Sequence, residues 1–263
     1  MNNSIPEKNI IWHHQLCSAL AELKIECHFF WFNDFELLKL VDHDFTIHLV
    51  NLNHHFCPED LTKLQGEYTA KGPKLIHLWE DVWITRSKQV LGRIASLLGL
   101  NNRIHGRKTT IQKITKPIAQ SFLNENHLQG YVSSRYKLGL FDKEQLVAVA
   151  TFSALRKMNY EENYKSAELI RFAVKTGYSV TGGLSKLISH FSEQYKPDDL
   201  MTYADRDWST GGAYVKLGFI NTDSLPPQYF CLDEHFNRSL IKENHFPRKT
   251  VFNTGSLKYI LKF

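Results

Sequence analysis

The chain lacks any apolar run of the roughly 20 residues that a membrane-spanning helix needs. Its first residues also lack a basic stretch followed by an apolar one, so the sequence predicts no secretion signal. The four cysteines form no C-x-x-C pair, which favours reduced, buried thiols. We therefore expect a cytoplasmic protein that has no membrane partner.

Charge is unevenly distributed along the chain. Residues 1–70 contain four Lys or Arg against ten Asp or Glu, whereas residues 71–117 contain ten against two. A basic segment of this density is suited to facing a polyanion such as nucleic acid. On charge alone a solvated helix face is the favoured interpretation, and both interpretations stay open.

The first hundred residues alternate between helical and strand patterns, which predicts a small α/β domain over residues 1–100. The glycines, asparagines and arginine of Gly99–Gly106 mark its end. The predicted helices cover residues 6–23, 34–40, from Pro58 to Gly72, and 83–98, and the predicted strands cover residues 24–32, 45–52 and 74–79.

Residues 101–235 predict a second α/β (α+β) domain with a mixed sheet flanked by helices. Residues 236–263 predict a basic tail that packs on this domain and ends in an edge strand or helix from Ser256. The predicted elements of the second domain are strands at 108–114, 137–141, 145–152, 166–174, 199–203 and 229–232, and helices at 116–126, from Gly182, and 209–217.

The stretch Ser166–Ser189 carries the strongest functional signal. An apolar strand ending at Val174 is followed by a break, by the pair Gly182-Gly183, and by a helix with Leu184 on its apolar face. A glycine turn at a helix N-terminus presents unpaired backbone N–H groups and a positive dipole end, and this arrangement binds anions such as a pyrophosphate.

This order of residues resembles the Gcn5-related (GNAT) acetyltransferases. The resemblance implies that Glu168, on the central strand, is the base that takes a proton from an attacking amine. It also implies acetyl-CoA or another acyl-CoA as cofactor, with its pyrophosphate on the glycine turn. The residues that it assigns to cofactor binding are Val174, Thr181, Gly182, Gly183, Leu184 and Ser185.

Two positions of the turn depart from the family pattern. The family has a basic or amide residue where this chain has Ser179, and a small residue where it has Leu184. A glycine pair is also common turn chemistry. Glu168 has a structural alternative too, an ion pair with Arg171 at the sheet surface.

Two further segments extend the resemblance. Gly212–Phe219 is close to the family's tyrosine-x-x-x-glycine-phenylalanine helix ending, so Tyr214 is expected to protonate the leaving thiolate. Leu200–Ser209, with Tyr203 and Asp205 as further candidate catalytic residues, looks like the phage DNA-modification branch that contains the Mom protein.

Residues 76–83 and 122–130 are similar to proteins labelled phage homing endonucleases, whose N-terminal part is related to very-short-patch-repair nucleases. Such nucleases need a strand Asp and a nearby Asp/Glu-x-Lys to hold Mg²⁺. Glu22-Leu23-Lys24 has the letters but falls at a predicted helix end, so we predict no metal site.

Two functions therefore remain open. The first is an acyl-CoA-dependent N-acyltransferase whose amine acceptor the sequence does not name. The second is a nucleic-acid-binding or nuclease-derived protein that uses the same fold without acyl transfer. For a nucleic-acid partner, Arg103, Arg107 and Lys108 are the predicted phosphate contacts.

Overall fold

The computed structural model describes residues 7–70, 72, 74–158, 162–241 and 250–263. It divides into two compact units. Unit 1 comprises Met1–Ser87, Asp205–Thr210 and Ser224–Ser256, and unit 2 comprises Lys88–Ala204, Gly211–Asp223 and Leu257–Phe263, within the described ranges. The predicted junction at 99–106 therefore lies inside unit 2, and the chain returns to unit 1 after Asp223.

Unit 1 is built on a four-stranded sheet with the order β1-β2-β3-β4, in which only β3 and β4 are parallel. A second, three-stranded sheet has the order β15-β14-β16. The elements are α1 (Glu7–Glu22), β1 (Cys27–Phe32), β2 (Phe35–Leu40), β3 (Phe45–Val50), α2 (Pro58–Ala70), β4 (Lys74–Trp79), β14 (Tyr229–Leu232), β15 (Arg238–Leu240) and β16 (Thr250–Phe252).

The short helix predicted over residues 34–40 is wrong, because this segment is strand β2. It pairs with β1 across a tight turn in which Asn33 has a φ of 53°, a left-handed conformation that asparagine tolerates. Leu37, Leu38 and Leu40 are fully buried. Burial against the core thus outweighs the capping signal of Asn33 and Asp34.

Helix α3 (Glu80–Leu97) begins in unit 1 and ends in unit 2. Its backbone departs from helical angles at Arg86, with φ −140° and ψ 28°, next to the boundary between Ser87 and Lys88. Among the residues described, every helix is too short or too polar to cross a membrane.

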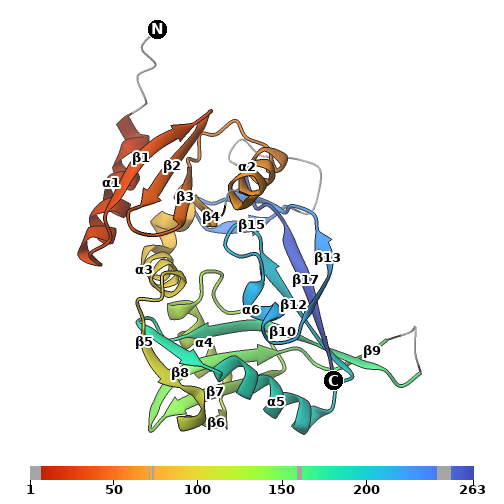
Figure 1. The fold of residues 1–263 in the computed structure, drawn as a ribbon. Coiled ribbons are helices and arrows are strands. Elements are labelled where there is room, and N and C mark those ends of the chain that lie inside the picture. Colours follow the sequence, from red (N-terminus) through yellow and green to blue (C-terminus); the bar gives the residue numbers. More distant parts are fainter. Residues whose placement is uncertain (1–6, 71, 73, 159–161, 242–249) are drawn as a thin grey trace. The chain divides into compact units, whose positions relative to one another are not determined.

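Unit 2 contains an eight-stranded sheet with the order β13-β17-β12-β10-β8-β7-β6, to which β9 adds beside β10 (Figure 1). Its elements are β5 (Asn102–His105), the 3₁₀ turn η1 (Gly106–Lys108), β6 (Thr110–Lys113), α4 (Lys116–Asn126), β7 (Tyr136–Asp142), β8 (Gln145–Phe152), β9 (Arg156–Lys157), β10 (Lys165–Val174), β11 (Tyr178–Thr181), α5 (Gly183–Tyr195), β12 (Asp199–Asp205), α6 (Gly212–Val215), β13 (Ile220–Leu225) and β17 (Ser256–Lys262).

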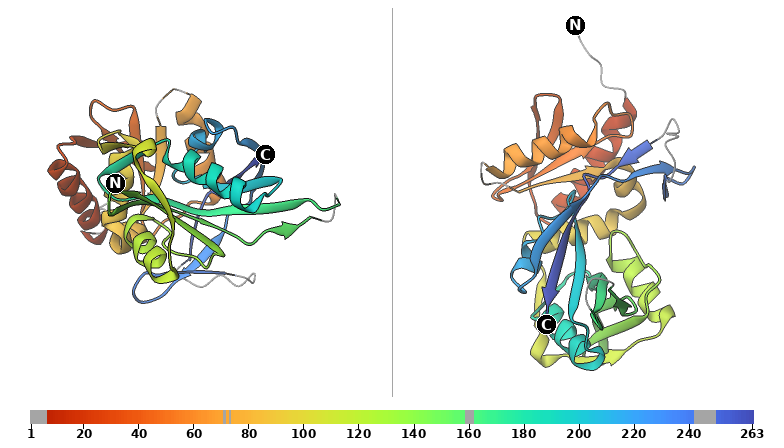
Figure 2. Two further views of the ribbon diagram at one scale, coloured as in Figure 1. Left: turned by 90° about the horizontal axis from the view of Figure 1, so that it is seen from below. Right: turned by 90° about the vertical axis from the view of Figure 1, so that its right-hand side faces the viewer.

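Helices α4 and α5 cover opposite faces of this sheet (Figure 2). Ala148 and Ala150 of β8 belong to the core that contains Leu187 and Phe191 of α5, whereas Val149 between them packs with α4. Alternation along a strand sends neighbouring side chains to opposite faces. The predicted mixed sheet flanked by helices is therefore confirmed.

Two pairings in unit 2 differ from the prediction. Residues 178–181, predicted as part of a break, form strand β11, which pairs in parallel with β5. The C-terminal segment Ser256–Lys262 lies between β12 and β13, so it is an interior strand and not an edge strand. Residues 242–249 of the predicted tail lie outside the described residues.

Candidate active site

The glycine turn joins β11 to α5. Gly182 is the N-cap of α5 and has φ 73° and ψ 4°, a left-handed conformation that glycine adopts without a steric penalty. A Cβ atom at Gly183 would lie 2.7 Å from Val180 Cγ1 and 3.0 Å from Leu140 Cδ1. The two glycines therefore meet separate demands, Gly182 for its backbone angle and Gly183 for the space that it leaves.

The first turn of α5 presents backbone N–H groups beyond this glycine pair. The first helical hydrogen bond runs from Lys186 N to Gly182 O at 3.0 Å. The amides of the three residues before Lys186 consequently have no acceptor inside the helix. Together with the helix dipole they favour a negatively charged group at this end of α5.

Strand β5 and the turn η1 pack directly against the glycine turn. In the β5–β11 ladder His105 is the partner of Thr181. A Cβ atom at Gly106 would lie 3.0 Å from both Gly183 N and Thr181 O. Only glycine allows the two backbones to approach this closely. The close contact brings residues 105–107 beside the N-terminus of α5.

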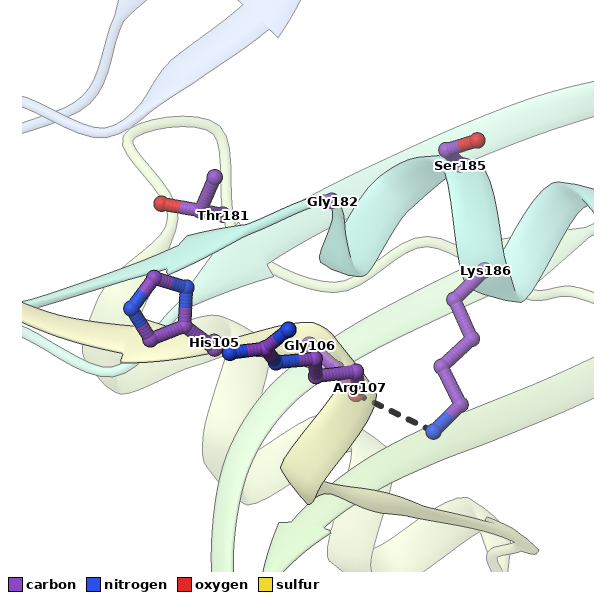
Figure 3. Close-up of a pocket in the computed structure, with 7 residues that line it drawn as sticks. All are labelled: His105, Gly106, Arg107, Thr181, Gly182, Ser185 and Lys186. Carbon is purple, nitrogen blue, oxygen red and sulfur yellow. Dashed lines mark hydrogen bonds between the residues drawn. The ribbon is translucent and has the colours of Figure 1, made fainter.

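These segments enclose a pocket of about 500 Å³ (Figure 3). The Lys186 ammonium donates a hydrogen bond of 3.0 Å to Gly106 O and another to Thr109 O. The lining is cationic, because it contains Arg107 and Lys186 and no acidic residue. It consists of His105, Gly106, Arg107, Thr181, Gly182, Ser185 and Lys186.

Glu168 lies in the half of β10 that pairs with β12. It is half-buried, and its backbone is fixed by hydrogen bonds of 2.9 Å between its N and Ser153 Oγ and between Ser153 N and its O. Arg171, the alternative ion-pair partner, donates to the carbonyl oxygens of Gly130 and Ile170.

The parallel pairing of β10 with β12 places Tyr203 on the same face as Glu168. In this ladder Glu168 is the partner of Met201, and Tyr203 follows two residues later, so its side chain leaves the same side of the sheet. Burial raises the pKa of Tyr203, and the nearby Glu168 charge raises it further. The Tyr203 hydroxyl therefore keeps its proton at neutral pH and is available as a donor.

The ladder between β10 and β12 ends at Glu168. The three paired positions are Ser166, Ala167 and Glu168, and β10 then carries an irregularity in its pairing with β8 between Leu169 and Arg171. A bulge redirects a strand and leaves backbone groups without ladder partners. The backbone thus departs from regular pairing immediately beyond the candidate base.

The other predicted site residues have varied surroundings. Val174 and Leu184 are partly buried against the core of unit 2. Tyr214 packs against the same core, with its ring 5.6 Å from Phe219 and 5.7 Å from Tyr259 between centroids. Asp205 ends β12 in unit 1, where its Oδ1 accepts a 3.1 Å hydrogen bond from Asp207 N.

The three residues predicted to contact nucleic acid differ in whether they line the pocket. Arg107 lines the pocket at the glycine turn, together with the predicted cofactor residues Thr181, Gly182 and Ser185. Arg103 and Lys108 are exposed on β5 and η1 and are not part of that lining.

Sequence reasoning did not identify His105, Gly106 and Lys186. One local signal was present for Lys186, because a lysine in the first turn of a helix opposes the dipole and needs a compensating partner. For His105 and Gly106 the local sequence carries none, since their place depends on the pairing of β5 with β11.

Within the described residues, no group of three or more His, Cys, Asp or Glu is arranged to hold a metal ion. No protein-family model and no curated protein matches the chain.

Comparison with solved structures finds acetyltransferases. They include a Bacillus subtilis acetyltransferase in complex with CoA (14% identity, 59% of this chain, 99% of that chain, TM-score 0.40). They also include the ribosomal-protein-S18-alanine N-acetyltransferase from Escherichia coli (16% identity, 59% of this chain, 93% of that chain, TM-score 0.39). A third is FeeM, an N-acyl amino acid synthase from uncultured soil microbes (14% identity, 59% of this chain, 91% of that chain, TM-score 0.39). At these scores the likeness says nothing about what this chain binds or transfers.

Proposed function

We propose that the protein is an acyl-CoA-dependent N-acyltransferase. The observation that carries this proposal is the continuity of unit 2 from Glu168 on β10, through the left-handed turn at Gly182, to a cationic pocket at the N-terminus of α5. One short stretch of chain thus supplies a carboxylate base and an anion site, the two features that acyl transfer from a diphosphate-bearing thioester needs.

The pocket residues fit the charged part of such a cofactor. The diphosphate is anionic, and Arg107, Lys186 and the free amides of α5 provide cations and donors without an opposing carboxylate in the lining. When bound, acyl-CoA supplies a thioester carbonyl that an amine can attack.

Glu168 prepares the acceptor. An amine is protonated at neutral pH and has no lone pair to attack with, so a carboxylate that accepts its proton speeds the reaction. The new C–N bond replaces the C–S bond, and the thiolate that leaves requires a proton. Tyr214 is the proposed donor of that proton, and Tyr203 orients the acceptor beside Glu168.

Binding of acetyl-CoA to the purified protein, followed by calorimetry, tests the proposal. Gly182→Val should abolish binding because valine resists the left-handed conformation and its side chain projects at the pocket. Gly177→Val is the matched control: Gly177 also has a positive φ, of 83°, and open space around its Cβ position, but it does not line the pocket. Wild-type protein that binds no acyl-CoA of any chain length contradicts the proposal.

Association with nucleic acid stays a prediction from the charge of residues 71–117 and from the resemblance to phage proteins. The exposed side chains of Arg103 and Lys108 are the groups still available for phosphate contacts. Binding to a random-sequence duplex should weaken with salt, with a log–log slope of about −0.9 for each phosphate neutralised. Absence of binding at low salt would make the basic segment a solvated surface.

A further inference from the structure

Residues 179–183 of the glycine turn contain no cation, and the ammonium of Lys186 that follows them already donates to Gly106 O and Thr109 O. The position where related acetyltransferases are expected to carry a basic or amide residue is Ser179, which lies half-buried in β11 as the ladder partner of Arg103. A diphosphate bound by backbone amides alone would lack the charge-assisted hydrogen bonds that make such contacts strong.

We infer that the 3₁₀ turn Gly106–Lys108 replaces the missing cation, and that Arg107 is the residue that recognises the cofactor's diphosphate. This inference rests on the proposed function and names the residue that gives it phosphate specificity. The segment that carries Arg107 is distant from α5 in the sequence: Gly106 and Lys186, which are hydrogen-bonded, are 80 residues apart. The phosphate site is therefore composite, built from η1 and from the first turn of α5.

The contact between the two segments is specific. Parallel pairing of β5 with β11 aligns His105 with Thr181, and the missing side chain of Gly106 lets η1 touch the glycine turn. Figure 3 shows His105 and Arg107 next to each other, on the side of the pocket that faces Gly182 and α5.

Lys186 holds η1 in this position. The oxygen of Gly106 accepts hydrogen bonds from Lys186 Nζ at 3.0 Å, from Thr109 N at 3.1 Å and from Thr109 Oγ1 at 2.6 Å. Lys186 also donates to Thr109 O, so its ammonium bridges the two ends of the turn. Lys186 and Arg107 are thus two cations in one pocket lining, which matches a ligand with two negative charges.

Arg107 is exposed, so truncating it should leave the fold unchanged. We therefore compare Arg107→Ala with the matched control Arg103→Ala, which removes an exposed arginine from the same strand-turn segment outside the pocket. Each variant is measured with acetyl-CoA and with acetyl-pantetheine, a thioester that lacks the diphosphate and the nucleoside.

Arg107→Ala should weaken acetyl-CoA binding by about tenfold or more, the size expected for a charge-assisted hydrogen bond. Arg103→Ala should leave acetyl-CoA binding unchanged, and neither variant should alter the KM for acetyl-pantetheine. Arg107→Lys should restore part of the lost affinity, because it keeps the charge but loses the forked geometry.

Three results would overturn the inference: equal losses in the two alanine variants, a loss for Arg107→Ala that is the same with acetyl-pantetheine, or unchanged acetyl-CoA affinity with weaker binding to duplex DNA. The last would assign Arg107 to nucleic acid. Failure of the proposed function looks different, because wild-type protein would then bind neither thioester.

Discussion

The histidine pair of unit 1 and the pocket of unit 2 differ in accessibility. In unit 1 the side chains of His48 and His77 are fully inaccessible, and their Nδ1 atoms are 2.9 Å apart. Unit 2 exposes Arg107 and His105 at a pocket of about 500 Å³. Both sets contain histidine, but of the two the pocket of unit 2 is the one open to a ligand.

Burial is the largest cause of the pKa shifts of His48, His77 and Asp207 in unit 1. It lowers the pKa of His77 to about 3 and that of His48 well below its usual value. Burial, together with the nearby charge of Asp205, raises the pKa of Asp207 to about 7. Shifted pKa values often mark functional sites, but here they accompany a packed interior. Accessibility, rather than the size of a shift, distinguishes the candidate site.

Unit 1 also contains an ion pair between a buried carboxylate and a partly buried guanidinium. Arg238 on β15 binds Asp81 at the start of α3 through Nε to Oδ2 at 2.6 Å and Nη2 to Oδ1 at 2.9 Å. The guanidinium lies 5.7 Å from the Trp79 ring and 5.6 Å from the Phe230 ring. This pair connects β15 to the first turn of α3.

The largest effect should come from Asp81→Ala, which leaves Arg238 without its partner. Removing one member of a fully buried ion pair costs about 3–5 kcal/mol of unfolding free energy. The Arg238 side chain is 22% exposed, so we expect a cost at or below the lower end of that range. Urea unfolding measures it. Asp34→Ala, at an exposed hairpin turn, is the control and should change stability little. Similar stability of the two variants would show that the pair contributes nothing.

Glu168→Gln tests the candidate site of unit 2. Loss of a general base should lower turnover by about 10²-fold, which corresponds to about 2.7 kcal/mol in the barrier, with little change in stability or cofactor affinity. Release of CoA, followed with a thiol reagent, measures it. Glu144→Gln, in the exposed turn between β7 and β8, is the control. Full activity of Glu168→Gln would reduce Glu168 to a structural residue.

Asp207→Asn should change how stability depends on pH. The pKa of Asp207 is about 7 in the folded protein and 3.8 in the free group. Its contribution to the free energy of unfolding is therefore fully present below pH 3.8 and is lost as the pH rises through 7. Asparagine does not titrate. The stability of the variant relative to wild type should therefore rise by about 2 kcal/mol between pH 5 and pH 8.

Urea unfolding at the two pH values checks this prediction. Any constant cost of the substitution cancels in the difference, and so do the contributions of groups that both proteins share. A pH-independent difference would place the Asp207 pKa near its ordinary value.

The smallest effect should come from Tyr214→Phe. The ring packs against the core of unit 2, and phenylalanine preserves that packing. Solvent can protonate a leaving thiolate, so turnover should fall by less than about tenfold. Steady-state kinetics at saturating acyl-CoA measures it. A loss as large as that of Glu168→Gln would make Tyr214 indispensable as the acid.

Local patterns predicted much of unit 2. The strands at 137–141 and 145–152, the helix at 116–126, the central strand at 166–174 and the glycine at the start of α5 are all confirmed. Each depends on contacts close in sequence or on an apolar pattern that one segment carries by itself. The strand that carries Glu168 and the glycine turn are therefore evident from local sequence, whereas the role of Glu168 as a base is a prediction from the family resemblance.

The sequence by itself determined the strand that carries Glu168 and the glycine turn with its helix. Only the tertiary structure decided that β5 pairs with β11, that β17 lies inside the sheet, and that Arg107 shares a pocket with Gly182. The reason is physical: a strand's own residues show that it prefers to be extended, but its partner is chosen by packing between segments far apart in the chain. The positive charge of Arg107 was evident from the sequence, but its place in the pocket depends on the pairing of β5 with β11.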